Sequence, residues 1–398
     1  MPRRLWNRWW YGEIGAGPLG LTRIALGLLV LAYIALLWPE RALWFSERGL
    51  LPVAQSDVFN ERNGHVPRID VLHGISSPHG LSVFFGVFAL AALLFTLGLG
   101  TRASAVAVWL CLLSLHNRNV PIHNSGDIVM IVMVAYLAIA PCGAACSLDR
   151  LRRVLKGQEG DTPPPIVPWA QRLMQLQIAT VYLCTSLSKL TGAQWRSGMA
   201  AYYPLHLPDS ARFPVFWADA DHLWLIRLLT WGAISIEIAL WTLIWVPRLR
   251  LWVLGAGVLL HLGIEYSLNI PLFSALMIAS YGVFLTPSDW GHFADWCAPV
   301  LAPFRLCLFY DEACGGCRRV VQMLRFCDGW GLVTFAPFAG GQGGKSAFIA
   351  RDAGGREYRG VNALRKTMSR LPALCVLAPL LFVPGAARVG RRIARDKA

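Results

Sequence analysis

The sequence predicts a mostly α-helical integral membrane protein, an eight-helix bundle followed by a small C-terminal α/β domain. Of its 398 residues, 55% are hydrophobic and only 15% are charged, and the mean hydropathy is +0.47. A soluble domain of this size is far less apolar, so a soluble enzyme and a disordered chain are both excluded. After residue 305, long apolar stretches give way to short ones bounded by turn residues, which indicates strands.

Eight apolar stretches account for the predicted bundle. They cover residues 18–38, 81–98, 103–115, 128–140, 171–190, 223–246, 251–268 and 271–285. A helix rising 1.5 Å per residue needs about 20 residues to cross a hydrocarbon core of about 30 Å. A proline-rich segment, 157–168, separates the first four stretches from the last four. We therefore expect a transmembrane domain over residues 1–290, a linker over 291–304 and a C-terminal domain over 305–398.

The distribution of Lys and Arg predicts the orientation. Short loops rich in these residues stay on the cytoplasmic side, and such residues cluster near the N-terminus and in the loops around 102, 150–156 and 248–250. The chain from Leu301 to Ala398 holds sixteen Lys and Arg against six Asp and Glu, and so supplies most of the net charge of +14. We expect a multi-pass protein of the bacterial inner (cytoplasmic) membrane with both termini cytoplasmic, membrane lipid as a partner, and no nucleic-acid partner.

Polar residues interrupt the predicted spans at a similar depth. The stretch 103–115 rises only about 20 Å, so the polar run that follows it lies below the outer surface. Counted along their helices, Lys189 lies about 26 Å above Arg172, and His261 lies about 15 Å above Leu251. Ionisable groups at such depth are costly unless they face one another or water. We therefore expect one outward-facing pocket, lined by His116, Asn117, Arg118, Asn119, His123, Asn124, Asp127, Lys189, His261 and Glu265.

The residue types in this pocket point to acid–base chemistry. A desolvated lysine favours its neutral amine, which makes Lys189 the candidate base. His261 and His116 are candidates to orient or polarise a substrate oxygen, and Arg118 to hold a developing anion. No spacing typical of a zinc site is present, so we expect no metal.

A structural alternative exists for each of these residues. Arg118 could form an ion pair with Asp127, His261 a bond with Glu265, and Lys189 an anchor at the membrane interface. The remaining charged residues on the spans, Glu237 and Arg23, are expected to be structural.

The lysine segment resembles a known family. Ser188-Lys189-Leu190, followed by Trp195-Arg196-Ser197-Gly198 and Tyr202-Tyr203, is similar to the Lys-Leu…Trp…Gly segment of the vitamin K-dependent gamma-carboxylase-like, or horizontally transferred transmembrane (HTTM), domain. The resemblance covers about residues 10–290. It implies that Lys189 matches the lysine that deprotonates a vitamin K hydroquinone, that His261 and Trp195 belong to the substrate pocket, and that a quinone or hydroquinone is the cofactor.

Three functions follow from this resemblance. Carboxylases continue into a large lumenal β-rich region that nothing in this chain replaces, so we favour an oxidoreductase with a quinone-like or lipid substrate in the outward-facing pocket, coupled to a C-terminal CxxC thiol-disulfide domain. One alternative is a gamma-carboxylase-like enzyme that modifies a small peptide or protein recognised through a separate subunit. The other is a non-catalytic membrane binding or transport module.

The C-terminal segment predicts a thiol redox domain. Residues 306–310 are typical of a strand, and Cys314-Gly315-Gly316-Cys317 opens a helix to about residue 328. Further strands are expected at 332–338, 347–351 and 356–359, and a helix at 361–369. A CxxC motif at a helix N-terminus lowers the pKa of its first thiol, so Cys314 is the candidate nucleophile and Cys317 the resolving residue.

This segment resembles the DCC family of thioredoxin-like thiol-disulfide oxidoreductases, with Glu312 in place of a glycine in the Tyr-Asp-Gly-x-Cys-x-x-Cys signature. The resemblance implies a disulfide-exchange partner, either an external protein or the pair Cys142 and Cys146. It extends to the basic ending at 391–395.

Overall fold

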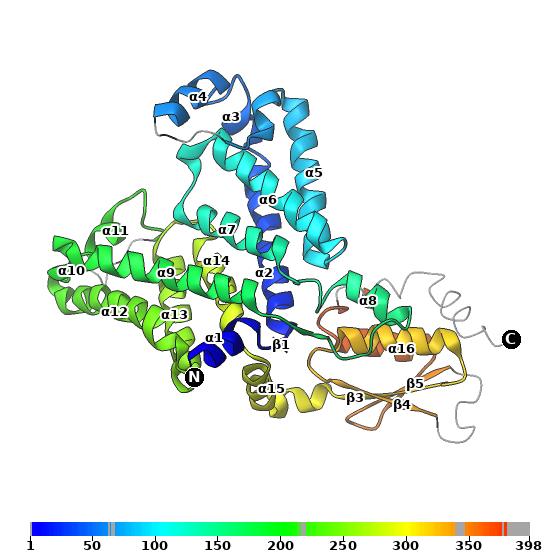
Figure 1. Ribbon diagram of the computed structural model, residues 1–398. Coiled ribbons are helices and arrows are strands. Elements are labelled where there is room, and N and C mark those ends of the chain that lie inside the picture. Colours follow the sequence, from blue (N-terminus) through cyan, green and yellow to red (C-terminus); the bar gives the residue numbers. More distant parts are fainter. Residues whose placement is uncertain are drawn as a thin grey trace. The chain divides into compact units, whose positions relative to one another are not determined.

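The computed structural model describes residues 2–62, 64, 68–213, 215, 220–338, 347–375 and 378–379. The chain divides into two compact units (Figure 1). The first consists of Met1–Ala145 and Pro164–Leu285, and the second of Cys146–Pro163 and Thr286–Ala398. The first unit is helical, and the second contains a mixed β-sheet with helices.

Each of the eight apolar stretches forms a helix in the first unit. They are α2 (Gly17–Leu37), α5 (Pro78–Leu97), α6 (Thr101–Arg118), α7 (Ser125–Ile139), α9 (Trp169–Thr191), α12 (Leu223–Thr242), α13 (Pro247–Ser267) and α14 (Phe273–Ser280). Four are long and apolar enough to cross a bilayer, namely α2, α5, α13 and α12 with the following turn η4 (Leu243–Trp245). The protein is therefore a multi-pass membrane protein.

The other four helices are either too short or too polar to count as candidate membrane spans. Helices α7 and α14 are apolar but have only 15 and 8 residues, and α14 is extended by η5 (Tyr281–Phe284). Helices α6 and α9 are long enough but carry more polar side chains. Eight apolar stretches thus correspond to four complete candidate spans in the described part of the chain.

Short elements connect these helices. They are α1 (Pro2–Tyr11), α3 (Arg41–Phe45), α4 (Val53–Arg62), η1 (Val71–Gly74), η2 (Val120–Ile122), α10 (Ala193–Arg196), α11 (Tyr202–His206), η3 (Ala220–His222), and the two-stranded ribbon of β1 (Ile14–Gly15) with β2 (Pro165–Ile166).

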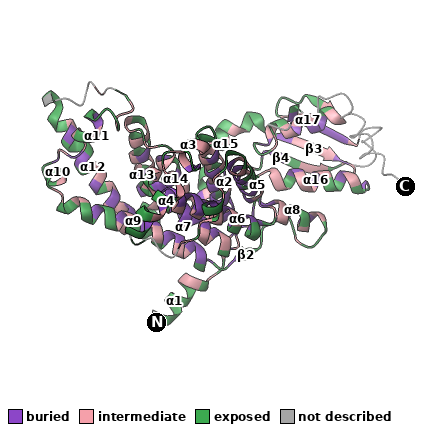
Figure 2. Cartoon of the chain, turned by 90° about the horizontal axis from the view of Figure 1, so that it is seen from above, coloured by how far each residue is buried: buried purple, intermediate pink, exposed green. Residues whose placement is uncertain are grey.

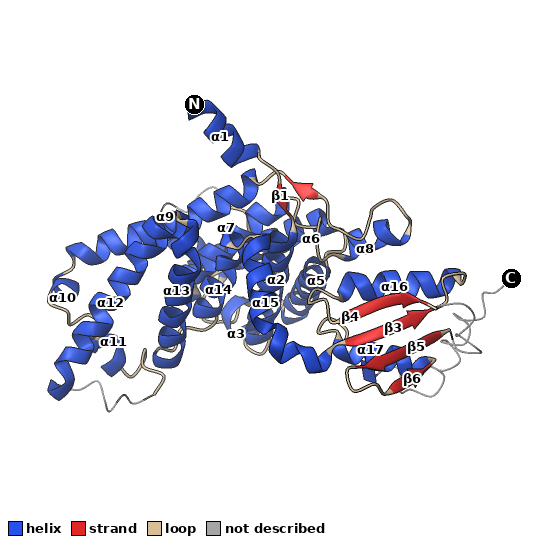
Figure 3. Ribbon diagram, turned by 90° about the horizontal axis from the view of Figure 1, so that it is seen from below, coloured by secondary structure: helices blue, strands red, loops and turns tan. Residues whose placement is uncertain are grey.

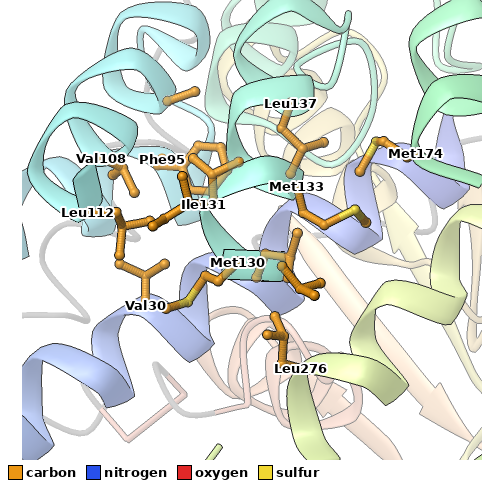
Figure 4. Close-up of a cluster of buried hydrophobic side chains, with 14 of the residues drawn as sticks. Val30, Phe95, Val108, Leu112, Met130, Ile131, Met133, Leu137, Met174 and Leu276 are labelled. Atoms are coloured by element: carbon orange, nitrogen blue, oxygen red, sulfur yellow. The ribbon is translucent and has the colours of Figure 1, made fainter. Parts of the chain in front are cut away.

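The core of the first unit is built by α2, α5, α6, α7, α9 and α14. Figure 4 shows their apolar side chains converging, among them Val30, Phe95, Leu112 and Met133. Close packing of α2 on α5 requires a small residue, because a Cβ at Gly27 would lie 3.0 Å from the Thr96 Cα. Small residues commonly let membrane helices approach each other in this way.

Arg23 is structural, as the sequence predicts. Its side chain is fully buried on α2. The guanidinium donates to the carbonyl oxygens of Cys142 at 2.9 Å, Thr96 at 3.4 Å and Ala145 at 3.5 Å. One side chain thus satisfies backbone groups at the ends of two other helices, where no water is expected.

Helices α12 and α13 are the least enclosed of the candidate spans. Of their apolar windows, 28% and 22% are buried, against 44% for both α2 and α5. Figure 2 shows these exposed positions in green. Their outer faces carry large apolar side chains, including Trp224, Trp252 and Leu259. In a multi-pass membrane protein we expect such faces to contact lipid.

The second unit contains a four-stranded sheet in the order β4-β3-β5-β6 (Figure 3). Its strands are β3 (Leu306–Tyr310), β4 (Val333–Pro337), β5 (Phe348–Asp352) and β6 (Glu357–Arg359). Strand β3 pairs parallel with β4 and antiparallel with β5, which pairs antiparallel with β6. Every strand predicted in this region is confirmed to within two residues.

Two helices complete the core of this sheet. Helices α16 (Gly315–Cys327) and α17 (Val361–Arg370) bury apolar side chains against Leu306, Leu308 and Tyr310, which alternate along one face of β3. The unit also contains α8 (Leu148–Leu155), α15 (Pro287–Leu301) and η6 (Ala302–Phe304). The predicted linker therefore forms helical turns. The basic ending at 391–395 lies outside the described residues.

We predict that Gly27→Ala destabilises the protein by about 1–3 kcal/mol, because the added methyl overpacks the contact between α2 and α5. The matched control is Gly86→Ala on α5, where a Cβ meets no atom within 4 Å. It should be neutral or slightly stabilising, since Ala is the better helix former. Thermal unfolding in detergent, followed by tryptophan fluorescence, measures both variants. Equal melting temperatures would contradict the close packing.

Candidate functional site

The candidate base of the predicted pocket is held in an ion pair. Lys189 lies near the end of α9, and its Nζ is bonded to the Oε1 of Glu237 on α12. Thr185, one turn earlier on α9, donates from Oγ1 to the Oε2 of Glu237 at 3.3 Å. The Lys189 Nζ also lies 5.1 Å from the ring centroid of Trp195 on α10. The structure thus brings Lys189 and Trp195 together and adds a carboxylate.

A second group of polar side chains lies on the same face of α9. Tyr182 is seven residues before Lys189, and its hydroxyl lies 2.8 Å from the His261 Nε2 on α13. The same hydroxyl lies 2.6 Å from the hydroxyl of Tyr281 in η5. Positions seven apart share a helix face, so α9 presents the phenol and the amine in one direction. We call Tyr182, Thr185, Lys189, Glu237, His261 and Tyr281 the Lys189 cluster.

One polar atom of this cluster has no partner. His261 is only 2% exposed. Its Nε2 contacts Tyr182, but its Nδ1 makes no hydrogen bond within the residues that the structure describes. A buried polar atom without a partner is costly. It is therefore available to a ligand that offers a hydrogen-bonding oxygen.

The histidines of the α6–α7 connection form a separate group. The ring centroids of His116 and His123 lie 4.6 Å apart. His123 Nδ1 lies 3.3 Å from the Tyr33 hydroxyl of α2 and 3.4 Å from Asp127 Oδ2. His123 Nε2 lies 3.2 Å from the carbonyl of Leu115, and because a carbonyl only accepts, this nitrogen carries a proton.

Asn124 and Asp127 cap a helix. They form a capping box at the start of α7, in which the backbone N–H of Asn124 donates to the Asp127 Oδ2 at 2.7 Å. The Oδ1 of Asn124 accepts from the Gly126 amide at 2.7 Å. This arrangement satisfies backbone donors that would otherwise be exposed. Their roles are therefore structural, and Asp127 does not provide the ion pair that the alternative interpretation gave to Arg118.

The polar residues that end α6 bind backbone carbonyls. Asn117 donates to Ile69, Asn119 to Trp44 at 2.8 Å, and the fully buried Arg118 to Phe45 at 3.2 Å. The Nε and Nη1 of Arg118 make no hydrogen bond to any described residue.

Asp70 lies close to this arginine. Burial raises the pKa of its carboxyl, while the charges of Arg68 and Arg118 act in the opposite direction. The negative charges near Arg118 are thus those of Asp70 and Glu47, two residues outside the predicted pocket.

The single predicted pocket therefore appears as two groups with Phe273 in contact with both. The ring of Phe273 lies 5.6 Å from the ring of His261, and its Cδ2 lies 3.1 Å from an ideal Cβ position at Gly126. Glu265 belongs to neither group, because its Oε1 pairs with Arg212 at 2.9 Å. We take the Lys189 cluster as the candidate site because it combines a Lys–Glu pair with the unpartnered His261 Nδ1, whereas most polar side chains of the α6–α7 connection cap a helix or bind backbone carbonyls.

Sequence reasoning missed four members of this site, among them Thr185, which bonds to Glu237. Glu237 was expected to be structural, and Tyr182 and Tyr281 were not singled out. The available signal was Glu237 itself, since a carboxylate inside an apolar helix needs a cationic partner.

The second unit holds a separate candidate site. Cys314 and Cys317 form a disulfide and are both at most 1% exposed. Cys314 is the N-cap of α16, and its Sγ accepts from the Cys317 amide at 3.2 Å. At the other end of α16, burial and the neighbouring Cys146 raise the pKa of the Cys327 thiol to about 11. Cys327 is therefore a poor nucleophile near neutral pH.

Comparison with known proteins identifies the membrane unit. The model of the HTTM domain family matches residues 11–290. No curated protein and no solved structure matches the chain. The family match ends before β3 begins, so the C-terminal unit is characterised here by its own structure as a small α/β region.

We predict strong coupling between Lys189 and Glu237. Lys189→Met or Glu237→Gln leaves one largely buried charge without its partner. The two single variants together should therefore lose more unfolding free energy than the double variant loses. A double-mutant cycle of unfolding free energies in detergent should give a coupling of about 1–3 kcal/mol. The more exposed pair Arg212 and Glu265 is the control, with an expected coupling below about 1 kcal/mol. Equal coupling in both pairs would refute the buried ion pair.

Proposed function

We propose that the chain, which belongs to the HTTM domain family shared with gamma-carboxylase, is a membrane oxidoreductase with a quinone-like or lipid substrate at the Lys189 cluster. The unpartnered His261 Nδ1 beside the Lys189–Glu237 pair carries this proposal. A ring hydroxyl or carbonyl oxygen satisfies that nitrogen, and the neighbouring Phe273 and Trp195 rings provide apolar walls. The residues present therefore fit a quinone-like ligand.

Proton transfer at this site is assigned to Lys189 and Glu237. As an ammonium in the ion pair, Lys189 cannot accept a proton, so it acts as a base only after giving one up. Glu237 already contacts the Nζ and is the acceptor that the structure offers. The resulting neutral amine can take a proton from a hydroxyl held by His261. A bound hydroquinone would supply such a hydroxyl.

Tyr182 positions the imidazole in this proposal. Its hydroxyl contacts both His261 Nε2 and the Tyr281 hydroxyl, which fixes the ring through the nitrogen opposite the unpartnered one. Holding one nitrogen in this way directs the other toward the ligand. Tyr182 and Tyr281 are thus positioning residues.

The proposed location is the bacterial inner membrane with both termini in the cytoplasm. The basic residues of the loops support it, because Lys and Arg favour the cytoplasmic side. Helix α8 illustrates this, with Arg150, Arg152 and Arg153 within its eight residues.

The second unit is proposed to be a DCC-type, thioredoxin-like thiol-disulfide oxidoreductase. Its support is the parallel β3-α16-β4 arrangement, with the CxxC motif at the start of α16 and the disulfide between its two cysteines. The helix N-terminus stabilises a thiolate on Cys314 once the disulfide is reduced. Cys314 then attacks a disulfide of a partner protein, and Cys317 releases the product.

We predict that Lys189→Arg abolishes turnover and spares binding. Arginine keeps the charge opposite Glu237 but is not deprotonated in proteins, so the base is lost without breaking the pair. With dioxygen supplied as the two-electron oxidant, oxidation of a naphthohydroquinone by protein in nanodiscs should fall at least about 100-fold, while equilibrium binding of the naphthoquinone is retained. Lys156→Arg, at the exposed end of α8, is the matched control and should be fully active.

The same assay separates the alternative functions. Wild-type turnover in the Lys189→Arg variant would exclude Lys189 as the base. Incorporation of carbon dioxide into a glutamate-rich peptide would assign the carboxylase-like function instead. Binding without any turnover in the unmodified protein would favour a binding or transport module.

We predict that Cys317→Ser traps a mixed disulfide on Cys314, because the resolving thiol is absent. The partner should be an external protein. Cys146 lies near Cys327, at the end of α16 opposite to Cys314. Because a helix of 13 residues is about 20 Å long, Cys146 is too far from Cys314 to form a disulfide with it. Mass spectrometry after mild oxidation identifies the adduct, with Cys307→Ser as the control that traps nothing. An adduct to Cys142 or Cys146 would favour internal exchange, and no adduct would contradict a redox role.

A further inference from the structure

An apolar groove lies between α12 and α13, away from the polar face that carries the Lys189 cluster. Its volume is about 290 Å³. Its lining residues are Ser235, Ile236, Ala239, Leu243, Leu249, Trp252, Val253 and Ala256. None of them carries a charge, and none belongs to the Lys189 cluster.

The shape of the groove fits a hydrocarbon chain. Along α12 the lining runs from Ser235 to Leu243, which corresponds to about 12 Å of helix. Small side chains at Ser235, Ala239 and Ala256 leave the space open. The volume lies at the lower limit of about 300–1,000 Å³ for small-molecule pockets, so a chain fits better than a bulky ring system.

A cationic group marks one end of the groove. Arg248 is exposed in the first turn of α13, and its side chain makes no hydrogen bond or ion pair with any residue that the structure describes. It lies four positions before Trp252, so both project from the same helix face. Trp252 is 80% exposed. An exposed Trp beside an Arg at the end of an apolar helix is typical of the headgroup level of a membrane.

We infer that this groove binds an acyl chain of an anionic phospholipid, with the lipid phosphate at Arg248. The apolar lining takes the chain, and Trp252 lies at the boundary between chain and headgroup. The positive charge selects an anionic lipid over a zwitterionic one, because the first turn of α13 contains no acidic residue to neutralise Arg248. A neutral isoprenoid chain lacks a group for this arginine.

Native mass spectrometry of the full-length protein tests the assignment. The protein is released from nanodiscs that contain equal amounts of phosphatidylglycerol and phosphatidylcholine with identical chains. We expect preferential retention of phosphatidylglycerol. Arg248→Gln should lower it about fivefold, the equivalent of about 1 kcal/mol for one basic residue at the surface.

Two further variants test the hydrocarbon part. Ala256→Leu fills the groove and should also lower retention, while Gly255→Leu adds the same side chain next to it, outside the lining, and should not. Arg102→Gln removes an equal charge from the exposed start of α6 and controls for net charge. Unchanged melting temperatures establish that the variants are folded.

Several outcomes would overturn the inference. Equal retention of both lipids would show that the site does not select charge. Equal effects of Arg248→Gln and Arg102→Gln would show that net charge alone acts. Loss of lipid in Ala256→Leu without any effect of Arg248→Gln would assign the groove to a neutral chain. Lys189→Arg should retain lipid normally, so failure here is distinguishable from failure of the catalytic proposal.

Discussion

The ion pair between Lys189 and Glu237 is the interaction on which the candidate site depends. It joins two helices through residues that are 48 positions apart in the chain, in surroundings where neither charge is well solvated. Once this pair is formed, the same face of α9 brings Tyr182 to His261. Arg23 shows the same constraint elsewhere, since it satisfies three carbonyl oxygens from two other parts of the first unit. Charged groups on these helices are placed by the partners that the protein itself must supply.

Hydropathy predicted the positions of the helices well, because apolar stretches of helical length leave few alternatives. It predicted their depth less well. Counting residues along each span assumes that all spans stand upright and parallel. In Figure 1, however, α9 and α12 run across the picture, whereas α2 and α5 run from top to bottom. Lys189, in the last turn of α9, therefore meets Glu237 of α12, which the sequence predicted to be only structural. A pairing between distant segments has no local signature in a single sequence.

The α6–α7 connection shows why polar runs within a membrane domain are ambiguous. Asn117, Arg118 and Asn119 all donate to backbone carbonyls, and Asn124 and Asp127 cap α7. A chain that leaves a helix within the membrane exposes backbone groups that water cannot reach. Side chains that satisfy this backbone are of the same types as those that bind a polar substrate. Composition alone therefore cannot distinguish a structural side chain from a substrate-binding one, whereas the hydrogen-bond partners in the structure distinguish them.

Glu237 on α12 and His261 on α13 bear on how a hydrophobic substrate would reach the site. These helices are the least buried of the candidate spans, so their outer faces are available to lipid, while α2 and α5 lie deeper in the core. A substrate dissolved in the bilayer can then approach sideways, without a passage through water that would expose its apolar surface. Enclosing the Lys189 cluster at the centre of the bundle would remove that path. For the proposed function, a Lys–Glu pair formed between α9 and one of these less buried helices would combine access for an apolar molecule with groups that can move its protons.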